Sequence, residues 1–114
     1  MSEIHGQDQP DEIVIEVVEN IVYETGMQPV APNPFNPTTQ IRFTLKDPEQ
    51  VVISIYDIRG RKVVDLVDGV YSRGPHSVTW HSKNQQGQQV ASGVYFARLK
   101  VGEDRFTRRM LLVK

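Results

Sequence analysis

From residue 39 onward the sequence is a succession of short alternating segments separated by turn residues, and this pattern constrains the fold more than any other feature. Alternation of apolar and polar residues over roughly four to eight positions is typical of strands with one buried face. This part of the chain shows no helical periodicity, so we expect a fold built from strands alone. The expected strands cover residues 39–45, 50–57, 61–67, 76–81, 89–101 and 105–113.

Turn residues divide these strands into hairpins. Asp57 and Gly60 occupy the first and fourth positions of a type I turn, and Asn84 and Gly87 repeat the same spacing. The sequence therefore predicts that the chain reverses direction at both places.

The segment 50–57 carries apolar residues on both of its faces, which is typical of a central strand. We expect residues 61–67 to pair with it as an antiparallel neighbour that ends at Asp68-Gly69. About seven strands at this spacing, without a helix, predict an all-β fold, an antiparallel β-sandwich of the immunoglobulin or fibronectin type.

The N-terminal part has a different character. Residues 1–12 are polar and aperiodic, and we expect a disordered leader. Residues 13–31 are expected to form an acidic strand followed by a proline-rich connector, because β-branched residues dominate up to residue 24 and four prolines follow between positions 29 and 37. The compact domain is then expected to cover residues 32–114.

Charge is distributed unevenly along the chain. Residues 1–41 hold seven acids and no Lys or Arg, whereas the remaining 73 residues hold 13 bases against seven acids, a net charge of +6. We expect the acidic segment to pack against the basic domain, either within one molecule or between two as a homodimer through residues 13–23. The bases are scattered singly along the strands, so nucleic acid is not the expected partner.

Several kinds of chemistry are not expected. The chain has no cysteine, which excludes disulfides and thiolate metal sites, and no apolar run of the roughly 18–20 residues that a membrane span requires. His76 and His81 are five positions apart on one expected strand, so they face opposite ways and cannot share a metal ion. No nucleophile elbow or phosphate-binding glycine loop is present, and we expect no enzyme and no cofactor.

Two segments have compositions that the formation of strands and turns alone does not explain. The first is a stiff, extended proline-rich segment that could close one end of the sandwich with Phe35 as a plug; it consists of Pro32, Asn33, Pro34, Phe35, Asn36 and Pro37. The second is the basic and apolar stretch 107–114, whose apolar residues occupy both faces. Such a strand is either buried between two layers or available for recognition by strand addition.

These segments, in their order, carry a family resemblance. The succession PNPFNPTTQIRFTL, VVISIYDIRGRKVVDLVDG and GPHSVTWHSKNQQGQQVASGVYFARLKVGEDRFTRRMLLVK resembles the type A C-terminal sorting domain of proteins exported by the bacterial type IX secretion system. The second half is also similar to the immunoglobulin-like domain of the flagellar hook-capping protein. One departure is His81-Ser82-Lys83 after the tryptophan, where related sequences have Asp or Asn followed by a small residue.

The resemblance implies a function as an address for a larger exported protein. Its implied partners are an N-terminal passenger domain, the outer-membrane translocon and a sortase-like peptidase, and the implied location is the cell surface or the medium. Matched positions are the proline-rich segment, the hairpin residues Tyr56, Asp57 and Gly60, and Gly93 with Tyr95. The implied recognition signal consists of Arg108, Arg109, Met110, Leu111, Leu112, Val113 and Lys114.

Two other functions remain open. A carbohydrate-binding or adhesive sandwich would need exposed aromatic residues on one face. We expect the core to use Phe43, Tyr56, Trp80 and Tyr95, which leaves Tyr23, Tyr71 and Phe96 as the residues whose shared exposure would favour a sugar platform. A structural module that resembles the hook cap is the other alternative.

Overall fold

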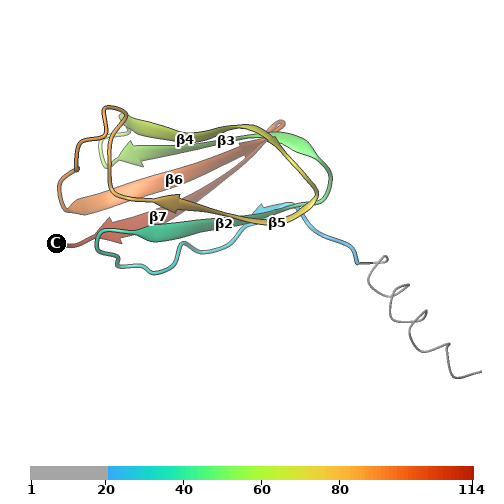
Figure 1. Cartoon of the computed structure of the whole chain (residues 1–114), viewed down its shortest axis with the longest axis horizontal. Helices are drawn as coiled ribbons and strands as arrows, with labels where there is room; N and C mark the ends of the chain where they lie inside the picture. The colour runs from blue at the N-terminus through green and yellow to red at the C-terminus, as the bar shows by residue number, and fades with distance from the viewer. Residues whose placement is uncertain (1–20) are drawn as a thin grey trace, which may run out of the picture.

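A computed structural model describes residues 21–114, and these residues form a β-sandwich of seven strands (Figure 1). The strands are β1 (Gly26–Met27), β2 (Thr39–Leu45), β3 (Glu49–Asp57), β4 (Lys62–Tyr71), β5 (Gly74–Trp80), β6 (Gly93–Val101) and β7 (Asp104–Leu112). One sheet has the order β1-β2-β5 and the other the order β4-β3-β6-β7, with antiparallel pairing throughout. The all-β sandwich predicted from the sequence is confirmed.

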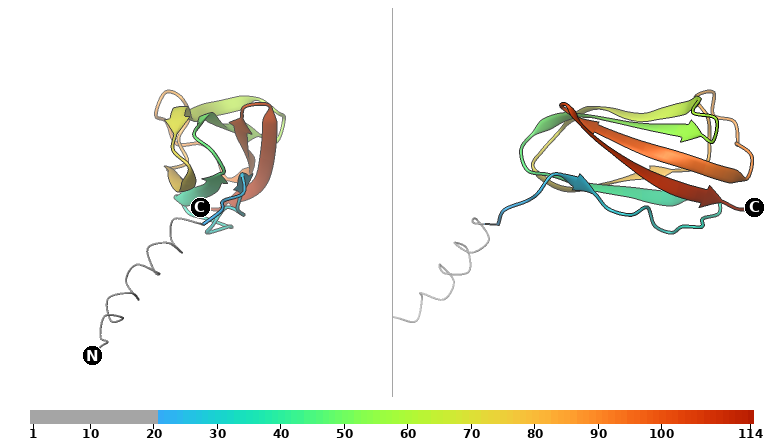
Figure 2. Two further views of the ribbon diagram at one scale, coloured as in Figure 1. Left: turned by 90° about the vertical axis from the view of Figure 1, so that its right-hand side faces the viewer. Right: turned by 180° about the vertical axis from the view of Figure 1, so that it is seen from behind.

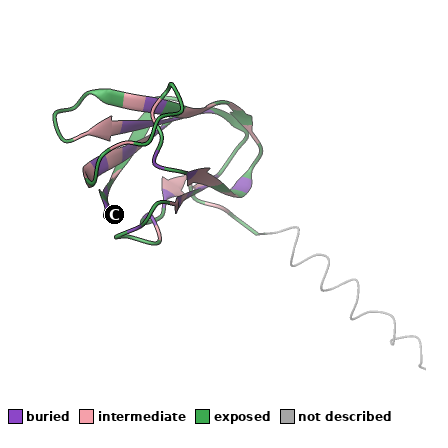
Figure 3. Cartoon of the chain, turned by 60° about the vertical axis from the view of Figure 1, so that its left-hand side comes forward, coloured by how far each residue is buried: buried purple, intermediate pink, exposed green. Residues whose placement is uncertain are grey.

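The core lies between the two sheets because each strand alternates inward and outward residues. In β2 the residues Ile41, Phe43 and Leu45 are fully buried, and in β6 Ala97 and Leu99 are fully buried. Figure 3 shows the same alternation as bands of buried and exposed residues along the strands. At about 25 cal/mol per Å² of apolar surface, this continuous interior supplies the main stabilising free energy.

The predicted central position of β3 is confirmed, since β3 pairs with β4 on one side and β6 on the other. The predicted end of β4 at Asp68-Gly69 is wrong, because the strand continues to Tyr71. Gly69 pairs with Val51 and Tyr71 pairs with Glu49, so the long partner strand supplies backbone partners beyond the glycine.

Tyr56 was expected in the core, and this expectation is also wrong. It alternates with Ile55, which is fully buried, and therefore lies on the outer face of the four-stranded sheet. The other three aromatic residues expected inside are buried: Phe43, Trp80 and Tyr95.

Two of the expectations for the N-terminal part, the disordered leader and most of the acidic strand, lie outside the described residues. The described end of that segment, residues 21–24, is not in a strand. The connector does contribute β1, where Gly26 and Met27 pair with Thr44 and Phe43. The structure describes no helix long and apolar enough to cross a membrane within residues 21–114.

Candidate functional site

The C-terminal stretch forms the second half of β7 and shows opposite environments on its two faces. Met110 and Leu112 are fully buried, whereas Leu111 is 36% and Val113 43% exposed. Strand alternation is the cause, because β7 covers the core with one face and is paired to β6 along its whole length. Only part of the sequence-predicted signal is therefore accessible: Arg109, Leu111, Val113 and Lys114.

The proline-rich segment covers the other edge of this strand. The Phe35 N–H donates to the Leu111 carbonyl (3.0 Å), and the Val113 N–H donates to the Phe35 carbonyl (3.0 Å), which forms a parallel bridge between Phe35 and Leu112. Asn33 adds two bonds, from its side-chain amide to the Arg109 carbonyl (3.0 Å) and from the Leu111 N–H to its side-chain oxygen (2.9 Å). The two segments singled out in the sequence thus form one unit, and the end of β7 is docked.

Phe35 fills the predicted role of a plug. Its side chain is 2% exposed, and its ring centroid lies 5.8 Å from that of Trp80. The Trp80 ring in turn lies 5.3 Å from Tyr95, edge to face, and its indole N–H donates to the Lys83 carbonyl (3.0 Å). This aromatic cluster closes the end of the sandwich where the chain's last residues lie.

Polar contacts fix both ends of the proline-rich segment. The Thr39 hydroxyl donates to the Pro32 carbonyl (2.7 Å), and the hydroxyl of Ser82 donates to the Pro37 carbonyl. The peptide bonds before Pro32, Pro34 and Pro37 are cis. Lys114 is also held in place, since its ammonium donates to the Val90 carbonyl (2.6 Å).

Asn33 provides a direct test of the docking. Replacing it with alanine removes both side-chain bonds to β7 and is expected to lower the free energy of unfolding by about 1–2 kcal/mol. Asn36 is the matched control, because within residues 21–114 its side chain has no hydrogen-bond partner, and Asn36→Ala is expected to stay near wild type. Urea denaturation of the two variants measures the difference, and equal losses would contradict the docking role.

Arg108 does not belong to the exposed surface. It projects from the core-facing side of β7, where its guanidinium donates to the Met27 carbonyl of β1 and thereby joins the two sheets. Its Nε atom is buried and has no hydrogen-bond partner among the described residues. Arg108 is therefore placed to hold the edge of the sandwich rather than to contact a partner.

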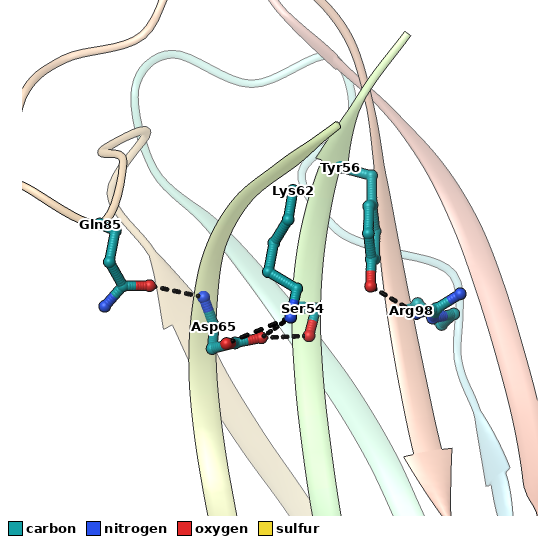
Figure 4. A network of polar contacts seen from close by, with 6 residues as sticks. All are labelled: Ser54, Tyr56, Lys62, Asp65, Gln85 and Arg98. Atoms are coloured by element: carbon teal, nitrogen blue, oxygen red, sulfur yellow. Dashed lines mark hydrogen bonds and ion pairs between the residues drawn. The ribbon is translucent and has the colours of Figure 1, made fainter. Parts of the chain in front are cut away.

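The outer face of the four-stranded sheet carries a polar network that the sequence pattern did not reveal (Figure 4). The Ser54 hydroxyl donates to Asp65 (2.5 Å), which also faces the Lys62 ammonium at 3.2 Å. On the neighbouring strand the Arg98 guanidinium lies 4.5 Å from the centre of the Tyr56 ring and donates to its hydroxyl. The outward positions of a central strand were the available clue to both pairs.

Two aspartates in this region have lowered pKa values. The backbone N–H of Arg61, followed by that of Arg59 and the Arg61 guanidinium, holds the pKa of Asp57 below its ordinary 3.8. The hydroxyl of Ser54, followed by Lys62, does the same to the pKa of Asp65. Near pH 3.8 the unfolded chain therefore binds more protons than the native state, so stability rises with pH in this range.

We expect the free energy of unfolding to be constant above about pH 5 and to fall as the pH drops through the native pKa values of these carboxyls. Urea titrations at a series of pH values from 7 to 3 measure the slope. The double variant Asp57→Asn/Asp65→Asn is expected to show a shallower fall. An unchanged slope in that variant would assign the acid sensitivity to other groups.

The turn residues shape the ends of the hairpins. Asp57 accepts the N–H groups of Arg59 and Arg61 (both 2.9 Å), and Gly60 has φ +82°. Despite the departure at residues 81–83, the next turn forms: the Asn84 side chain accepts the N–H groups of Gln86 and Gln88 (both 3.0 Å), and Gly87 has φ +80°. Gly93, with φ +151°, is the first residue of β6 and pairs with Leu112.

The aromatic residues proposed as a sugar platform do not come together. Tyr71 packs edge-on against Phe43 (5.5 Å between ring centroids), and the Arg73 guanidinium lies 4.8 Å above the ring of Tyr23. Phe96 lies on β6, opposite Tyr56 on the outer face of the four-stranded sheet, whereas Tyr71 packs towards the core. These residues occupy separate places, which removes the main support for the carbohydrate-binding alternative.

The two strand histidines also lie in different environments. His76 stacks on Phe43 (5.3 Å) and its Nε2 atom lies 2.7 Å from the Ser72 carbonyl, whereas His81 is exposed beyond the end of β5. In the described part of the chain no group of three or more metal-ligating side chains is present.

A known protein family matches part of this chain. The family described as the FlgD Ig-like domain matches residues 33–104. No curated protein sequence matches the chain significantly.

Two solved structures share the fold. Dimeric latent PorU from Porphyromonas gingivalis is 21% identical, with a TM-score of 0.65 over 82% of this chain and 10% of that protein. PorZ from the same organism, described as an essential bacterial surface component of its type IX secretion system, is 23% identical, with a TM-score of 0.57 over 78% of this chain and 12% of that protein. The chain therefore spans about a tenth of either protein, and at these identities the likeness concerns the fold.

Proposed function

The chain belongs to the FlgD Ig-like domain family, and on this premise we propose that it is a non-catalytic sorting domain that directs a larger exported protein through the bacterial type IX secretion system. The observation that carries the proposal is the docked end of β7, where Arg109, Leu111 and Val113 form a fixed exposed row. A receptor would read this row on a folded domain, with no need to order a loose peptide.

Two further observations support the proposal. The fold recurs as about an eighth of PorZ, a surface component of that secretion system, which is consistent with a module attached to larger exported proteins. The sequence order of the proline-rich segment and the basic-apolar end resembles that of the type A sorting domains. The proposed partners are the N-terminal passenger, the outer-membrane translocon and the sortase-like peptidase, and the proposed location is the cell surface or the medium.

An export assay tests the proposal. A fluorescent passenger fused ahead of residues 1–114 is expected to reach the surface or medium of a type IX-competent host and to remain in the periplasm of a host without the translocon. Leu111→Asp changes the exposed row and leaves the buried residues of β7 in place. This variant is expected to be retained as in the translocon-deficient host.

Val70→Asp is the matched control for this substitution. Val70 is another exposed aliphatic residue, 75% accessible, and lies on β4 at the far edge of the same sheet. Its variant is expected to be exported normally. Export that survives loss of the translocon, or equal retention of both variants, would overturn the assignment.

A second candidate is a structural assembly module, which is favoured by the resemblance of the second half of the sequence to the immunoglobulin-like domain of the flagellar hook-capping protein. Under this alternative, self-association of the domain would be its function. Light scattering of the purified chain over a dilution series distinguishes the two, since a monomer at all concentrations would exclude the assembly function.

A further inference from the structure

The exposed row on β7 continues sideways across the outer face of the four-stranded sheet. Strand pairing places Leu111 opposite Val94 and Arg109 opposite Phe96. On the next strand, Phe96 lies opposite Tyr56. These side chains point outward because they alternate with buried residues of β3, β6 and β7. In the right-hand view of Figure 2, β6 and β7 lie side by side, and the C-terminus is at the end of the sandwich opposite their turn.

A second cation completes this surface. Arg98 lies two positions after Phe96 on the same face of β6, and its guanidinium is 4.5 Å from the centre of the Tyr56 ring and donates to the Tyr56 hydroxyl (Figure 4). We call the following set the outer patch: Tyr56, Phe96, Arg98, Arg109 and Leu111. The outer patch joins three strands, and only two of its members belong to the row on β7.

The composition of the outer patch is typical of a protein-binding surface. Aromatic residues and arginine are enriched in protein interfaces, and tyrosine and arginine are among the residues that most often dominate the binding energy. Tyr56 and Phe96 are partly exposed and Arg109 is exposed, so apolar area lies beside positive charge. Neither ring belongs to the core, which lies on the other side of the sheet. The two rings are therefore available for contact with a partner.

Acids limit the positive charge of this face to the outer patch. Glu103 and Asp104 lie at the turn between β6 and β7 and balance the cations that flank this turn. Arg109 is five positions from Asp104, about 16 Å along the strand, whereas the Debye length at physiological ionic strength is about 8 Å. Among residues 21–114, neither Arg98 nor Arg109 forms an ion pair. Their charges remain for a partner.

Two further acids determine which kind of partner fits. Asp65 and Asp68 lie on β4, on the same outer face, where Asp68 accepts a hydrogen bond from Gln50 (2.6 Å). A continuous anionic surface, such as a layer of lipid headgroups, would bring negative charge against both aspartates. A protein segment can place its carboxylates over β6 and β7 alone. The distribution of charge thus favours a protein partner over a membrane.

We propose that the outer patch is the docking surface for an acidic segment of the receptor. Phe96 and Leu111 contact an apolar side chain of that segment, and Arg98 and Arg109 pair with carboxylates on either side of it. This inference rests on the proposed sorting function and names the chemistry of its partner. Charge pairs of this kind steer the encounter and fix the orientation of the partner, so Phe96 and Arg98 contribute to specificity from outside the row on β7.

The export assay tests this inference with residues outside the row. Phe96→Ser and Arg98→Gln are each expected to lower the amount of exported passenger about tenfold, the size of effect typical of an interface residue that contributes to binding. The matched controls lie on the same outer face: Lys100→Gln removes the next charge along β6, and Val52→Ser changes the residue opposite it on β3. Both controls are expected to be exported normally.

Urea denaturation of the purified variants shows whether each is folded. Arg98→Gln leaves the core and the Phe96 ring in place, and it carries the test should Phe96→Ser not fold. Normal export of Arg98→Gln, while Leu111→Asp is retained, would overturn the outer patch and leave the sorting function standing. A loss for Lys100→Gln equal to that for Arg98→Gln would also overturn it. Wild-type export that does not need the translocon would overturn both the function and the inference.

A binding experiment distinguishes a protein partner from lipid headgroups. The purified chain is mixed with vesicles of phosphatidylglycerol and phosphatidylcholine, which are then sedimented. The chain is expected to stay in the supernatant. Sedimentation with the vesicles that Arg98→Gln abolishes would assign the outer patch to anionic lipid and overturn the proposal.

Discussion

Replacing Phe35 with alanine is expected to lower the free energy of unfolding by about 3–5 kcal/mol, the cost typical of emptying a buried aromatic site. The side chain is 2% exposed and packs against Trp80, so its removal leaves a cavity beneath the end of β7. Because the Phe35 backbone bonds to Leu111 and Val113, loss of the plug also loosens the docked strand end. Urea denaturation at pH 7 measures the stability loss.

Hydrogen exchange locates the effect of this substitution. In Phe35→Ala the Val113 amide is expected to exchange faster than in the wild type, with a larger change than amides in the middle of β3. Phe35→Leu keeps most of the apolar volume and is expected to lose less stability. Equal losses for the two variants would contradict this expectation and would show that apolar volume without the aromatic ring does not stabilise the site.

Trp80→Ala is expected to have an effect of similar size, about 3–5 kcal/mol. Trp80 is 1% exposed, contacts both Phe35 and Tyr95, and ties its indole N–H to the Lys83 carbonyl. Trp80→Phe retains an aromatic ring and gives up that hydrogen bond, so the difference between the two variants separates packing from the bond. Thermal or urea unfolding gives both values.

The double variant Phe35→Ala/Trp80→Ala measures the coupling between the two rings. Aromatic pairs contribute about 0.5–1.5 kcal/mol beyond the area that they bury, so the double variant is expected to lose less than the sum of the single losses. Val70→Ala, on the exposed edge of the sandwich, is the control and is expected to stay within about 0.5 kcal/mol of wild type. Strict additivity would argue that the two rings do not act as one plug.

Sequence reasoning succeeded where a local pattern determines the structure. Alternation located β2 at residues 39–45, because burial of one sheet face leaves its period in the sequence. It failed where the expectation that an aromatic residue is buried competes with the alternation of inward and outward residues along a strand. Tyr56 is among the aromatic residues predicted in the core, yet it alternates with the buried Ile55 in β3 and lies outside, where the Arg98 guanidinium lies over its ring.

The candidate site was only half predictable. The proline-rich segment and the terminal stretch both stand out by composition, but nothing local indicates that Asn33 bonds to Leu111, 78 positions away. Likewise, the predicted strand end at Gly69 is wrong, because the partner strand β3 is long enough to pair with the residues that follow it. Contacts of this kind depend on register between distant segments, which a single sequence does not encode in any short window.

The bridge between Phe35 and β7 also determines when the domain can finish folding. The Phe35 plug and its backbone partners at Leu111 and Val113 are among the first and last residues of the sandwich, so the end of the fold cannot close until residues 111–113 have been synthesised. Contacts of such long sequence separation form late, because the intervening chain must be ordered first. A truncated chain would thus lack both the exposed row and the closed end, and display of that row would report that translation of the domain had run to completion.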